Sequence, residues 1–217
     1  MKKNSFTAAG VFGVLFLLLI VLVKTVDVAQ IGPAGTSIGL SSLNGGFHDA
    51  VGVHMFWYKL TEGLGILAIL VAAMFAFVGL MQLIKRKSLL KVDKNIMVLG
   101  CLYICVVAFY VIFEVIVVNY RPIVMPGETV PEASFPSSHT MLICVIMGSA
   151  MMQIKEYGHT VKTGQILKLV CWAILIVTVV GRLICGVHWF TDILGGLLLS
   201  AALLLLYKGA MEKINNA

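Results

Sequence analysis

Six stretches of hydrophobic residues, separated by short polar segments, run along this chain of 217 residues. Their approximate limits are 6–26, 63–84, 96–118, 138–154, 168–187 and 190–207. A helix needs about 20 apolar residues to cross the hydrocarbon of a bilayer, so the fourth and sixth stretches must use their polar flanks. No stretch alternates apolar and polar residues as a barrel strand does. The pattern therefore predicts an all-α, polytopic membrane protein with six transmembrane helices.

The composition agrees with this prediction. Hydrophobic residues make up 60% of the chain and charged residues 12%, whereas charged residues are about 25% of a typical soluble domain. We expect a single membrane domain over residues 1–217. The five cysteines lie within or beside apolar stretches and form no CxxC pair, which predicts neither a disulfide nor a zinc framework.

The positive charges predict the orientation of the chain. The net charge is +6, but the charges lie in short segments between the apolar stretches, a pattern typical of membrane topology and not of nucleic-acid binding. Twelve of the 16 basic residues fall on one side of the predicted bundle, namely Lys2, Lys3, Lys85, Arg86, Lys87, Lys91, Lys94, Lys155, Lys162, Lys168, Lys208 and Lys213. This side is predicted to be cytoplasmic, which places both termini inside the cell.

The first apolar stretch has two interpretations. Lys2 and Lys3 precede it, as basic residues precede the core of a cleaved signal peptide. However, no clear small-x-small cleavage site follows, and Lys24 interrupts its end. We therefore expect it to be retained as a transmembrane helix.

The first outer segment, residues 27–62, is rich in Gly and Ser and is expected to be a loop over the outer face, as a lid or a headgroup selector. Trp57 and Tyr58 near its end are typical of the membrane interface. His48, Asp49 and His54 suggest a metal site as an alternative. No helical HxxxH pair or further ligand supports that alternative, so no metal is predicted.

Six ionisable residues fall at the outer ends of the third to sixth stretches: Glu114, Arg121, His139, Arg182, His188 and Asp192. Translocon scales put an Arg or Asp at the centre of a span at about 2.5–3.5 kcal/mol, and the cost falls toward the ends. A small transporter or channel also gathers charges inside a bundle, but near the midplane and with broken helices. The position of these residues at one end favours a site on the outer face.

The spacing of these residues predicts their chemistry. His188 and Asp192 are four residues apart, so a helix would place them on one face, where a carboxylate fixes the tautomer of an imidazole and stabilises its cation. Arg121 and Arg182 offer guanidinium groups that hold two phosphate oxygens at once. Pro122 is expected to end the third span.

Ser137, Ser138 and His139 stand at the start of the fourth stretch. The N-terminus of a helix presents free N–H groups to an anion, and His139 is available there as a proton donor. Together the two arginines, the helix N-terminus and the two histidines predict a phosphate site with a double displacement at phosphorus. The arginines would supply the charge stabilisation that a metal supplies elsewhere.

These residues make the chain similar to the type 2 phosphatidic acid phosphatase family of membrane lipid phosphatases. That family has the motifs K-x6-RP, PSGH and SR-x5-H-x3-D. This chain has E-x6-RP, PSSH and GR-x5-H-x3-D, formed by Glu114, Arg121, Pro122, 136–139, Gly181, Arg182, His188 and Asp192. The motifs cover residues 114–192, and the six-span layout covers nearly the whole chain.

The resemblance implies a role for each residue. His188 would be the nucleophile that forms a phosphohistidine, Asp192 would orient it, and His139 would be the general acid. Phosphoryl oxygens would be held by Arg121, Arg182, Ser137 and Ser138. The resemblance also implies no metal or other cofactor. It implies a lipid phosphate substrate in the bilayer. The distribution of Lys and Arg places the site on the extracytoplasmic side of the cell membrane.

The resemblance leaves the lipid open among undecaprenyl diphosphate, phosphatidylglycerol phosphate and phosphatidic acid. The outward site favours undecaprenyl diphosphate, because carrier lipids are recycled on that side. A catalytically inactive member of the family is an alternative. The related vanadate-dependent haloperoxidases share the anion site but are soluble as a rule, so six spans argue against them.

Glu114 is the main departure from the family motifs, because it replaces a phosphate-binding lysine. Like charges about 4 Å apart repel by about 4 kcal/mol at an effective dielectric constant near 20. We therefore expect Glu114 to modulate the site without touching phosphate as an anion. The first hypothesis is that it pairs with Arg121 or Arg182, and the alternatives are that it binds a polar headgroup or stays protonated.

Overall fold

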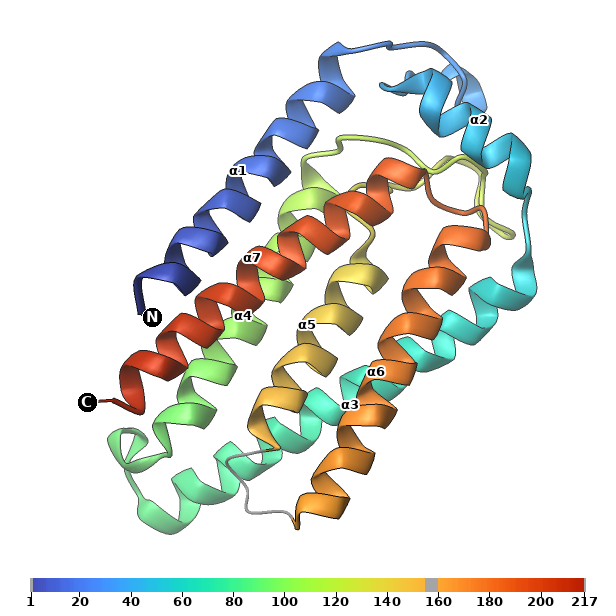
Figure 1. The fold of residues 1–217 in the computed structure, drawn as a ribbon. Coiled ribbons are helices and arrows are strands. Elements are labelled where there is room, and N and C mark those ends of the chain that lie inside the picture. The colour runs from blue at the N-terminus through green and yellow to red at the C-terminus, as the bar shows by residue number, and fades with distance from the viewer. Residues whose placement is uncertain (1, 155–159, 217) are drawn as a thin grey trace.

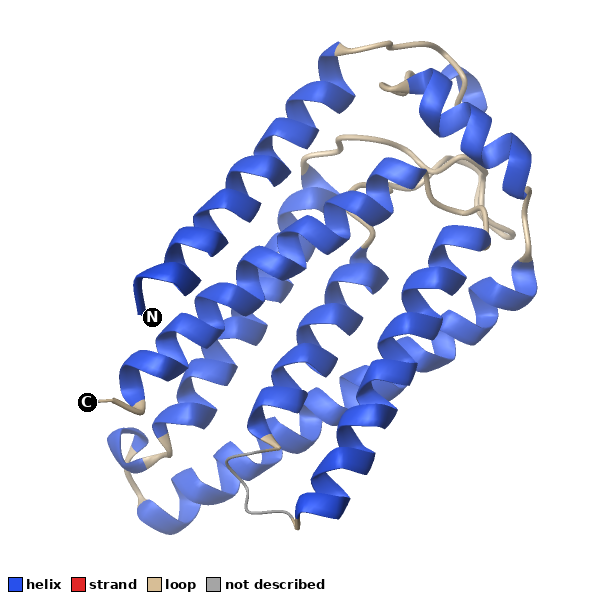
Figure 2. Ribbon diagram, in the orientation of Figure 1, coloured by secondary structure: helices blue, strands red, loops and turns tan. Residues whose placement is uncertain are grey.

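The computed structural model describes residues 2–154 and 160–216, and the described residues form an all-helical bundle (Figures 1 and 2). The predicted all-α fold is confirmed. Lys155, one of the basic residues assigned to the cytoplasmic side, lies outside the described residues. The helices in chain order are α1 (Lys2–Thr25), α2 (Ser41–Val51), α3 (Met55–Arg86), α4 (Lys94–Val115), α5 (Ser138–Gln153), α6 (Val161–Ile184) and α7 (Phe190–Ile214).

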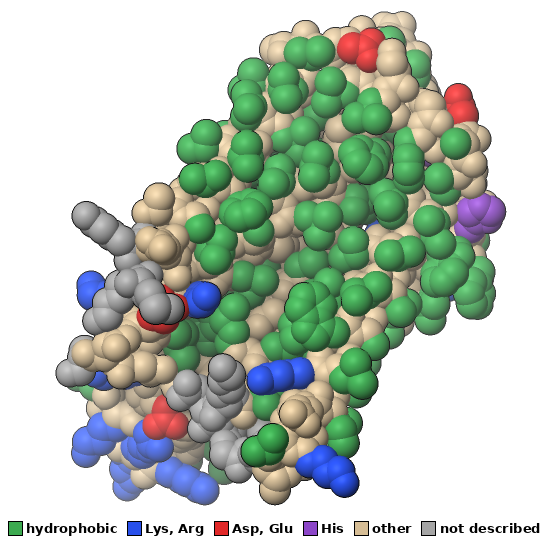
Figure 3. Space-filling model, viewed as in Figure 1, with side chains coloured by type: hydrophobic (Ala, Val, Ile, Leu, Met, Phe, Trp, Pro, Cys, Tyr) green, Lys and Arg blue, Asp and Glu red, His purple; other side chains and the backbone are tan. Residues whose placement is uncertain are grey.

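Five of these helices are long and apolar enough to cross a membrane: α1, α3, α4, α6 and α7. The fourth predicted span corresponds to α5, which has only 16 residues. Helix α5 lies between α6 and α7 (Figure 1), and most of its side chains are buried. Its apolar sequence therefore serves the core of the bundle, while the lateral surface of the longer helices carries exposed hydrophobic side chains (Figure 3).

The outer segment 27–62 is not a loop, and that prediction was wrong. It contains a short 3-10 turn (Pro33–Gly35), all of α2 and the first two turns of α3. Helix α2 is capped by Asp27, which lies 14 residues before Ser41 in the sequence. The Ser42 N–H and the Ser41 hydroxyl donate to its carboxylate at 2.7 and 2.9 Å. These hydrogen bonds lower the pKa of Asp27, and the one from the Ser42 N–H contributes most.

Helix α2 is fixed to the bundle by a buried amide. The side chain of Asn44 donates to the Thr191 hydroxyl at 3.0 Å and accepts from the Thr191 N–H at 3.1 Å. Thr191 belongs to the first turn of α7, so α2 packs against the end of α7 that follows His188. This contact explains why a Gly-rich segment of low helix propensity is helical here.

Two predicted boundaries also differ from the structure. The third span was expected to reach residue 118 and to be stopped by Pro122, but α4 ends at Val115. Pro122 therefore does not end the helix. The fifth span was expected from residue 168, but α6 begins at Val161, where the Thr160 hydroxyl caps it by accepting from the Thr163 N–H.

A ring cluster supports the outer half of the bundle. Phe135 stacks on Phe16 of α1 with centroids 5.8 Å apart, and its edge meets Phe113 of α4 at 6.1 Å. Gly195 of α7 allows Phe135 this close approach, because a Cβ at residue 195 would lie 2.6 Å from the Phe135 ring. Phe135 precedes the Pro-Ser-Ser-His segment directly, so this packing fixes where that segment lies.

Candidate active site

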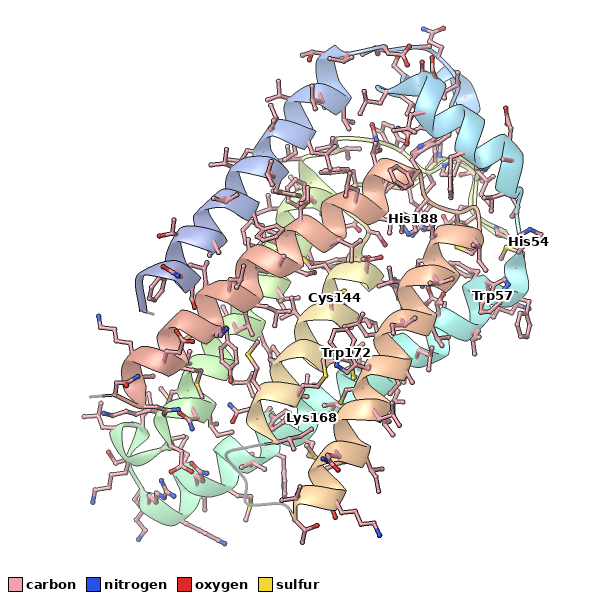
Figure 4. All side chains as sticks on the ribbon, in the orientation of Figure 1. His54, Trp57, Cys144, Lys168, Trp172 and His188 are labelled. Carbon is pink, nitrogen blue, oxygen red and sulfur yellow. The ribbon has the colours of Figure 1, made fainter. Side chains whose placement is uncertain are left out.

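The residues predicted to form a site meet at the end of the bundle away from both termini, where Figure 4 labels His188. They come from five parts of the chain. Arg121 lies in the connection between α4 and α5, Ser138 and His139 begin α5, and Arg182 lies in the last turn of α6. His188 lies in the turn between α6 and α7, and Asp192 in the first turn of α7.

The turn that carries His188 is tightly packed against the start of α3. Gly186 has φ +71°, and a Cβ there would lie 1.9 Å from the Gly52 carbonyl oxygen, so glycine is required. The backbone N–H of His54 donates to the Cys185 carbonyl at 3.0 Å. The Nε2 atom of His48 lies 3.2 Å from the Gly186 carbonyl oxygen and donates to it. Both histidines that suggested a metal site thus hold the turn in place.

Ser134 lies between His188 and Asp192, which sequence reasoning did not foresee. Its hydroxyl oxygen is 3.0 Å from His188 Nδ1 and 2.5 Å from Asp192 Oδ2. The direct separation of His188 Nδ1 and Asp192 Oδ2 is 3.7 Å. The two side chains pair as expected, but not from one helix, because α7 begins at Phe190, two residues after His188.

Arg121 fixes the tautomer of His188. Its Nη1 atom lies 3.4 Å from His188 Nε2, and a guanidinium can only donate hydrogen bonds. Nε2 must therefore carry a lone pair, and the proton of the neutral ring must be on Nδ1, which donates to Ser134. The serine in turn donates to Asp192. The arrangement leaves the lone pair of His188 Nε2 facing a cation.

His188 is almost completely buried. Burial lowers its pKa well below the usual value of 6.5, and the nearby charges of Arg121 and Arg182 act in the same direction. The imidazole is therefore neutral at physiological pH, which is the form in which a histidine can act as a nucleophile.

Asp192 is held as a buried hydrogen-bond acceptor. Besides Ser134, its carboxylate accepts from the Trp189 N–H at 2.9 Å and from the Asn119 amide at 3.3 Å. The Trp189 contact also caps α7, because Asp192 occupies the third position of that helix. These donors compensate the burial of the carboxylate.

The N-terminus of α5 forms the floor of the site. Ser137 is its cap and accepts hydrogen bonds from the N–H and hydroxyl of Thr140. The side chain of Ser137 is thus buried and already partnered, whereas Ser138 lines the cavity together with Arg121 and His188. The first N–H groups of a helix have no partner within it and favour an anion at this position.

Arg182 is fully buried and meets a carboxylate that the sequence analysis did not single out. Its Nη2 donates to Oε1 of Glu62 in α3. The same oxygen lies 3.1 Å from His139 Nε2. The guanidinium also lies 5.0 Å from the centroid of the Tyr58 ring, within reach of a cation–π contact.

Comparison with known proteins agrees with this geometry. Residues 115–215 match the family model described as the PAP2 superfamily. This part of the chain, which holds Arg121, His139, Arg182, His188 and Asp192, belongs to the PAP2 superfamily. A curated relative, phosphatidylglycerophosphatase B of Bacillus subtilis (strain 168), is 34% identical over 95 residues, which are 43% of this chain and 47% of the relative. The matched region thus spans about half of the length of that relative.

A solved structure shows the same fold over nearly the whole chain. It is the crystal structure of a transmembrane PAP2-type phosphatidylglycerolphosphate phosphatase from Bacillus subtilis, with a TM-score of 0.67 and 20% identity. The likeness covers 95% of this chain and 97% of that one. Together with the apolar helices, it supports a multi-pass membrane protein.

Glu114, which replaces the lysine of the family motif, does not have the partners that the sequence predicted. Arg121 Nε pairs with Glu132 at 2.8 Å, and Arg182 pairs with Glu62. Among the described residues Glu114 pairs with neither arginine, so the first hypothesis for it was wrong. The expected helical spacing to Arg121 does not exist, because α4 ends directly after Glu114. Glu114 lines the cavity beside Arg121 and His139 instead.

Two cavities converge on the PAP2 site residues. An outer cavity of about 540 Å³ is lined by Arg121, Ser138 and His139 together with the carboxylates Glu62, Glu114 and Glu132. A second cavity of about 320 Å³ lies between α3 and α4, and its lining is mainly apolar and extends from His139 into the bundle's lateral surface. In the described residues, no group of three or more His, Cys, Asp or Glu side chains is arranged to hold a metal ion.

Proposed function

We propose that this PAP2 chain is a lipid phosphate phosphatase that works through a phosphohistidine on His188. The observation that carries the proposal is the pair formed by His188 Nε2 and the Arg121 guanidinium, 3.4 Å apart. A nucleophilic lone pair and a phosphate-binding cation face the same space. No metal takes part in the proposed steps, because Arg121, Arg182 and the α5 N-terminus supply the positive charge.

In the first step, His188 Nε2 attacks phosphorus while the bond from phosphorus to the leaving oxygen breaks. His139 donates a proton to that oxygen. The positive charge that develops on the His188 ring is stabilised through Ser134 by the Asp192 carboxylate. In the second step, water attacks the phosphohistidine, His139 takes its proton, and the bond between phosphorus and Nε2 breaks.

The cavity between α3 and α4 supports a lipid as the substrate. It is lined by Ile66 and Ile69 of α3 and by Val106 and Val107 of α4, and it reaches Ser138 and His139. A lipid chain can lie in this cavity and in the adjacent bilayer while its phosphate meets His188. The PAP2 site thus accepts a substrate from the membrane without removing its tail from apolar surroundings.

The proposed orientation places the site on the extracytoplasmic side and both termini in the cytoplasm, with α5 as the sixth span. The charge distribution supports it, since Lys and Arg side chains gather at the end of the bundle that holds the termini (Figure 3). Basic residues favour the cytoplasmic side. The test is protease or thiol-reagent access to tagged termini and to a cysteine placed at Glu128.

Phosphatidylglycerol phosphate is the first substrate to test, because both similar proteins are described as phosphatases of that lipid. This choice replaces the weak preference for undecaprenyl diphosphate that the sequence suggested. The experiment measures phosphate release by purified protein in EDTA from these two lipids and from phosphatidic acid. Release that disappears in His188→Ala supports the proposal, whereas folded wild-type protein that is silent on all three indicates an inactive PAP2 member or a transporter.

A further inference from the structure

We propose that Glu62 is a positioning residue for His139, which stabilises the cation of this imidazole and aims its second N–H at the leaving oxygen. The inference rests on the proposed function. It concerns α3, a helix that lies outside the PAP2 motifs at 114–192 and outside the family match at 115–215.

The geometry of one oxygen atom carries the inference. Oε1 of Glu62 accepts from Nη2 of Arg182 and lies 3.1 Å from Nε2 of His139. Because a carboxylate only accepts, Nε2 of His139 must carry the hydrogen in this contact. A single side chain of α3 thus orders two groups that the PAP2 motifs supply from α5 and α6.

Helix α3 is shaped to receive His139. Gly65 lies three residues after Glu62 and therefore on nearly the same face of α3. A Cβ at Gly65 would lie 3.0 Å from Cδ2 and 3.3 Å from Nε2 of His139. The absence of a side chain at this position lets the imidazole ring approach α3 closely enough to reach the carboxylate.

His139 and Arg182 each keep side-chain nitrogens that do not contact Glu62, and these nitrogens indicate which ligand the site takes. The buried side-chain nitrogens of the described site that lack a hydrogen-bond partner include Nδ1 of His139 and both Nε and Nη1 of Arg182. Arg182 is fully buried, so its two free N–H groups require an acceptor. Phosphoryl oxygens satisfy the guanidinium, and the leaving oxygen satisfies Nδ1.

The two histidines of the site have opposite surroundings. His188 faces a hydroxyl at Nδ1 and a guanidinium at Nε2, both of which suit the neutral ring. His139 faces a carboxylate at Nε2, which suits the cation. A nucleophile must be neutral and a general acid must be protonated, so this difference in partners assigns the two roles.

Other charged groups surround His139. The positive charges of Arg182 from α6 and Arg121 from the connection face this ring and repel its cation. On the α4 side the cavity is lined by Glu114 and Tyr110, and toward solvent by Glu132 and Tyr58. Among the described carboxylates, Glu62 is the one in direct contact with the His139 ring. Its negative charge therefore stabilises the cation that the two arginines disfavour.

The test follows His139 directly by NMR. Protein with labelled histidine in detergent is titrated, and the His139 signal is assigned by its absence in His139→Asn. Glu62→Gln keeps the shape of the side chain but removes the charge, and we expect the proton affinity of His139 to fall about tenfold or more. Glu128→Gln removes an exposed carboxylate that does not line the site, so it is the matched control and should leave the proton affinity of His139 unchanged.

The kinetic counterpart is the alkaline limb of the pH profile of kcat/KM. A general acid acts below its pKa, so Glu62→Gln should lose at least about tenfold at pH 8.5 and much less at pH 5.5. Glu62→Asp keeps the charge and should return the limb toward its wild-type position. A merely structural role would lower the rate by one factor at every pH.

The outcomes separate the two proposals. An unchanged His139 titration in folded Glu62→Gln protein overturns the role of Glu62, whether or not the wild type is active. A changed titration in protein that hydrolyses no lipid phosphate supports the link between Glu62 and His139 and overturns the proposed function. Loss of activity in Glu62→Gln that is equal at all pH values also overturns the inference.

Discussion

The Ser134 hydroxyl bridges His188 and Asp192, at 3.0 Å from the imidazole Nδ1 and 2.5 Å from the carboxylate. The backbone N–H of Ser134 donates to the Asn119 carbonyl at 2.9 Å, and the Asn119 amide in turn reaches Asp192. The serine is thus fixed at both its backbone and its side chain. The orientation of His188 depends on a residue that lies outside the three sequence motifs.

Removal of this bridge should slow the chemical step. In Ser134→Ala, Nδ1 of His188 loses its acceptor, and we expect kcat to fall about 10- to 100-fold with little change in KM, less than the 10²–10⁴-fold typical of a direct acid or base. Ser134→Thr retains a hydroxyl and should keep most of the activity. Equal losses in the two variants would show that packing at residue 134, and not the hydroxyl, is what matters.

The acid limb of activity should reflect the low pKa of His188. The ring attacks when neutral, that is, above its pKa, and burial places that pKa well below 6.5. We therefore expect kcat/KM to remain nearly constant as the pH falls through 6.5. The pH profile on a soluble short-chain lipid phosphate measures this, and a limb centred at 6.5 would contradict a buried neutral His188.

The same shift predicts how stability depends on pH. Because the folded pKa of His188 is lowered, the unfolded chain binds more protons than the folded one below about pH 6.5. His188 therefore costs stability as the pH falls from 6.5 toward the folded pKa. Thermal unfolding in detergent at pH 7 and pH 5 should show a larger loss for wild type than for His188→Asn, and equal losses would exclude this linkage.

The contact of Gly195 with Phe135 should control the position of the α5 N-terminus. In Gly195→Ala the new Cβ would lie 2.6 Å from the Phe135 ring. We expect a loss of about 1–3 kcal/mol in stability and a fall in kcat as the segment before Ser137 moves. Gly100→Ala in α4 has no atom within 4 Å of the new Cβ and serves as the control. If both variants keep wild-type stability and kcat, the Phe135 ring moves aside at little cost, and the prediction is wrong.

A substitution that fills the cavity between α3 and α4 should affect only substrates with long lipid tails. Val107 lines it from α4, so Val107→Trp is expected to raise KM for a long-chain lipid phosphate several-fold. Turnover of a short-chain, water-soluble phosphate should stay near wild type. Val177→Trp places the same bulk on the exposed side of α6 and should affect neither substrate. A similar loss on both substrates in Val107→Trp would argue against tail binding there.

Much of the fold follows from the sequence, because apolar stretches of span length allow little except helices. The exceptions have tertiary causes. Helix α2 contains Gly45 and Gly46 and is stabilised by Asn44 through its contacts with Thr191, a partner 147 residues away. The sequence of helix α5 does not reveal that the helix is short and mostly covered by its neighbours, because burial by protein and burial by lipid favour the same residues.

The site was predicted in part for a similar reason. Arg121, His139, Arg182, His188 and Asp192 stood out because ionisable residues in apolar surroundings require compensation. Ser134 carries no charge and lies in a polar connection, so only its position in space reveals it. Glu62 gave a weak signal as an acid at the outer end of a span, but nothing in the sequence pairs α3 with α5 and α6.

The central claim is that His188 Nε2 attacks phosphorus. The most direct test is to mix the protein with phosphatidylglycerol phosphate labelled in its terminal phosphate, quench in alkali within milliseconds to seconds, and locate the label by peptide mass spectrometry. The account predicts an acid-labile, alkali-stable phosphohistidine at residue 188 that is absent in His188→Ala and turns over as phosphate is released. Phosphate release with no labelled protein at any time, or label on another residue, would contradict it.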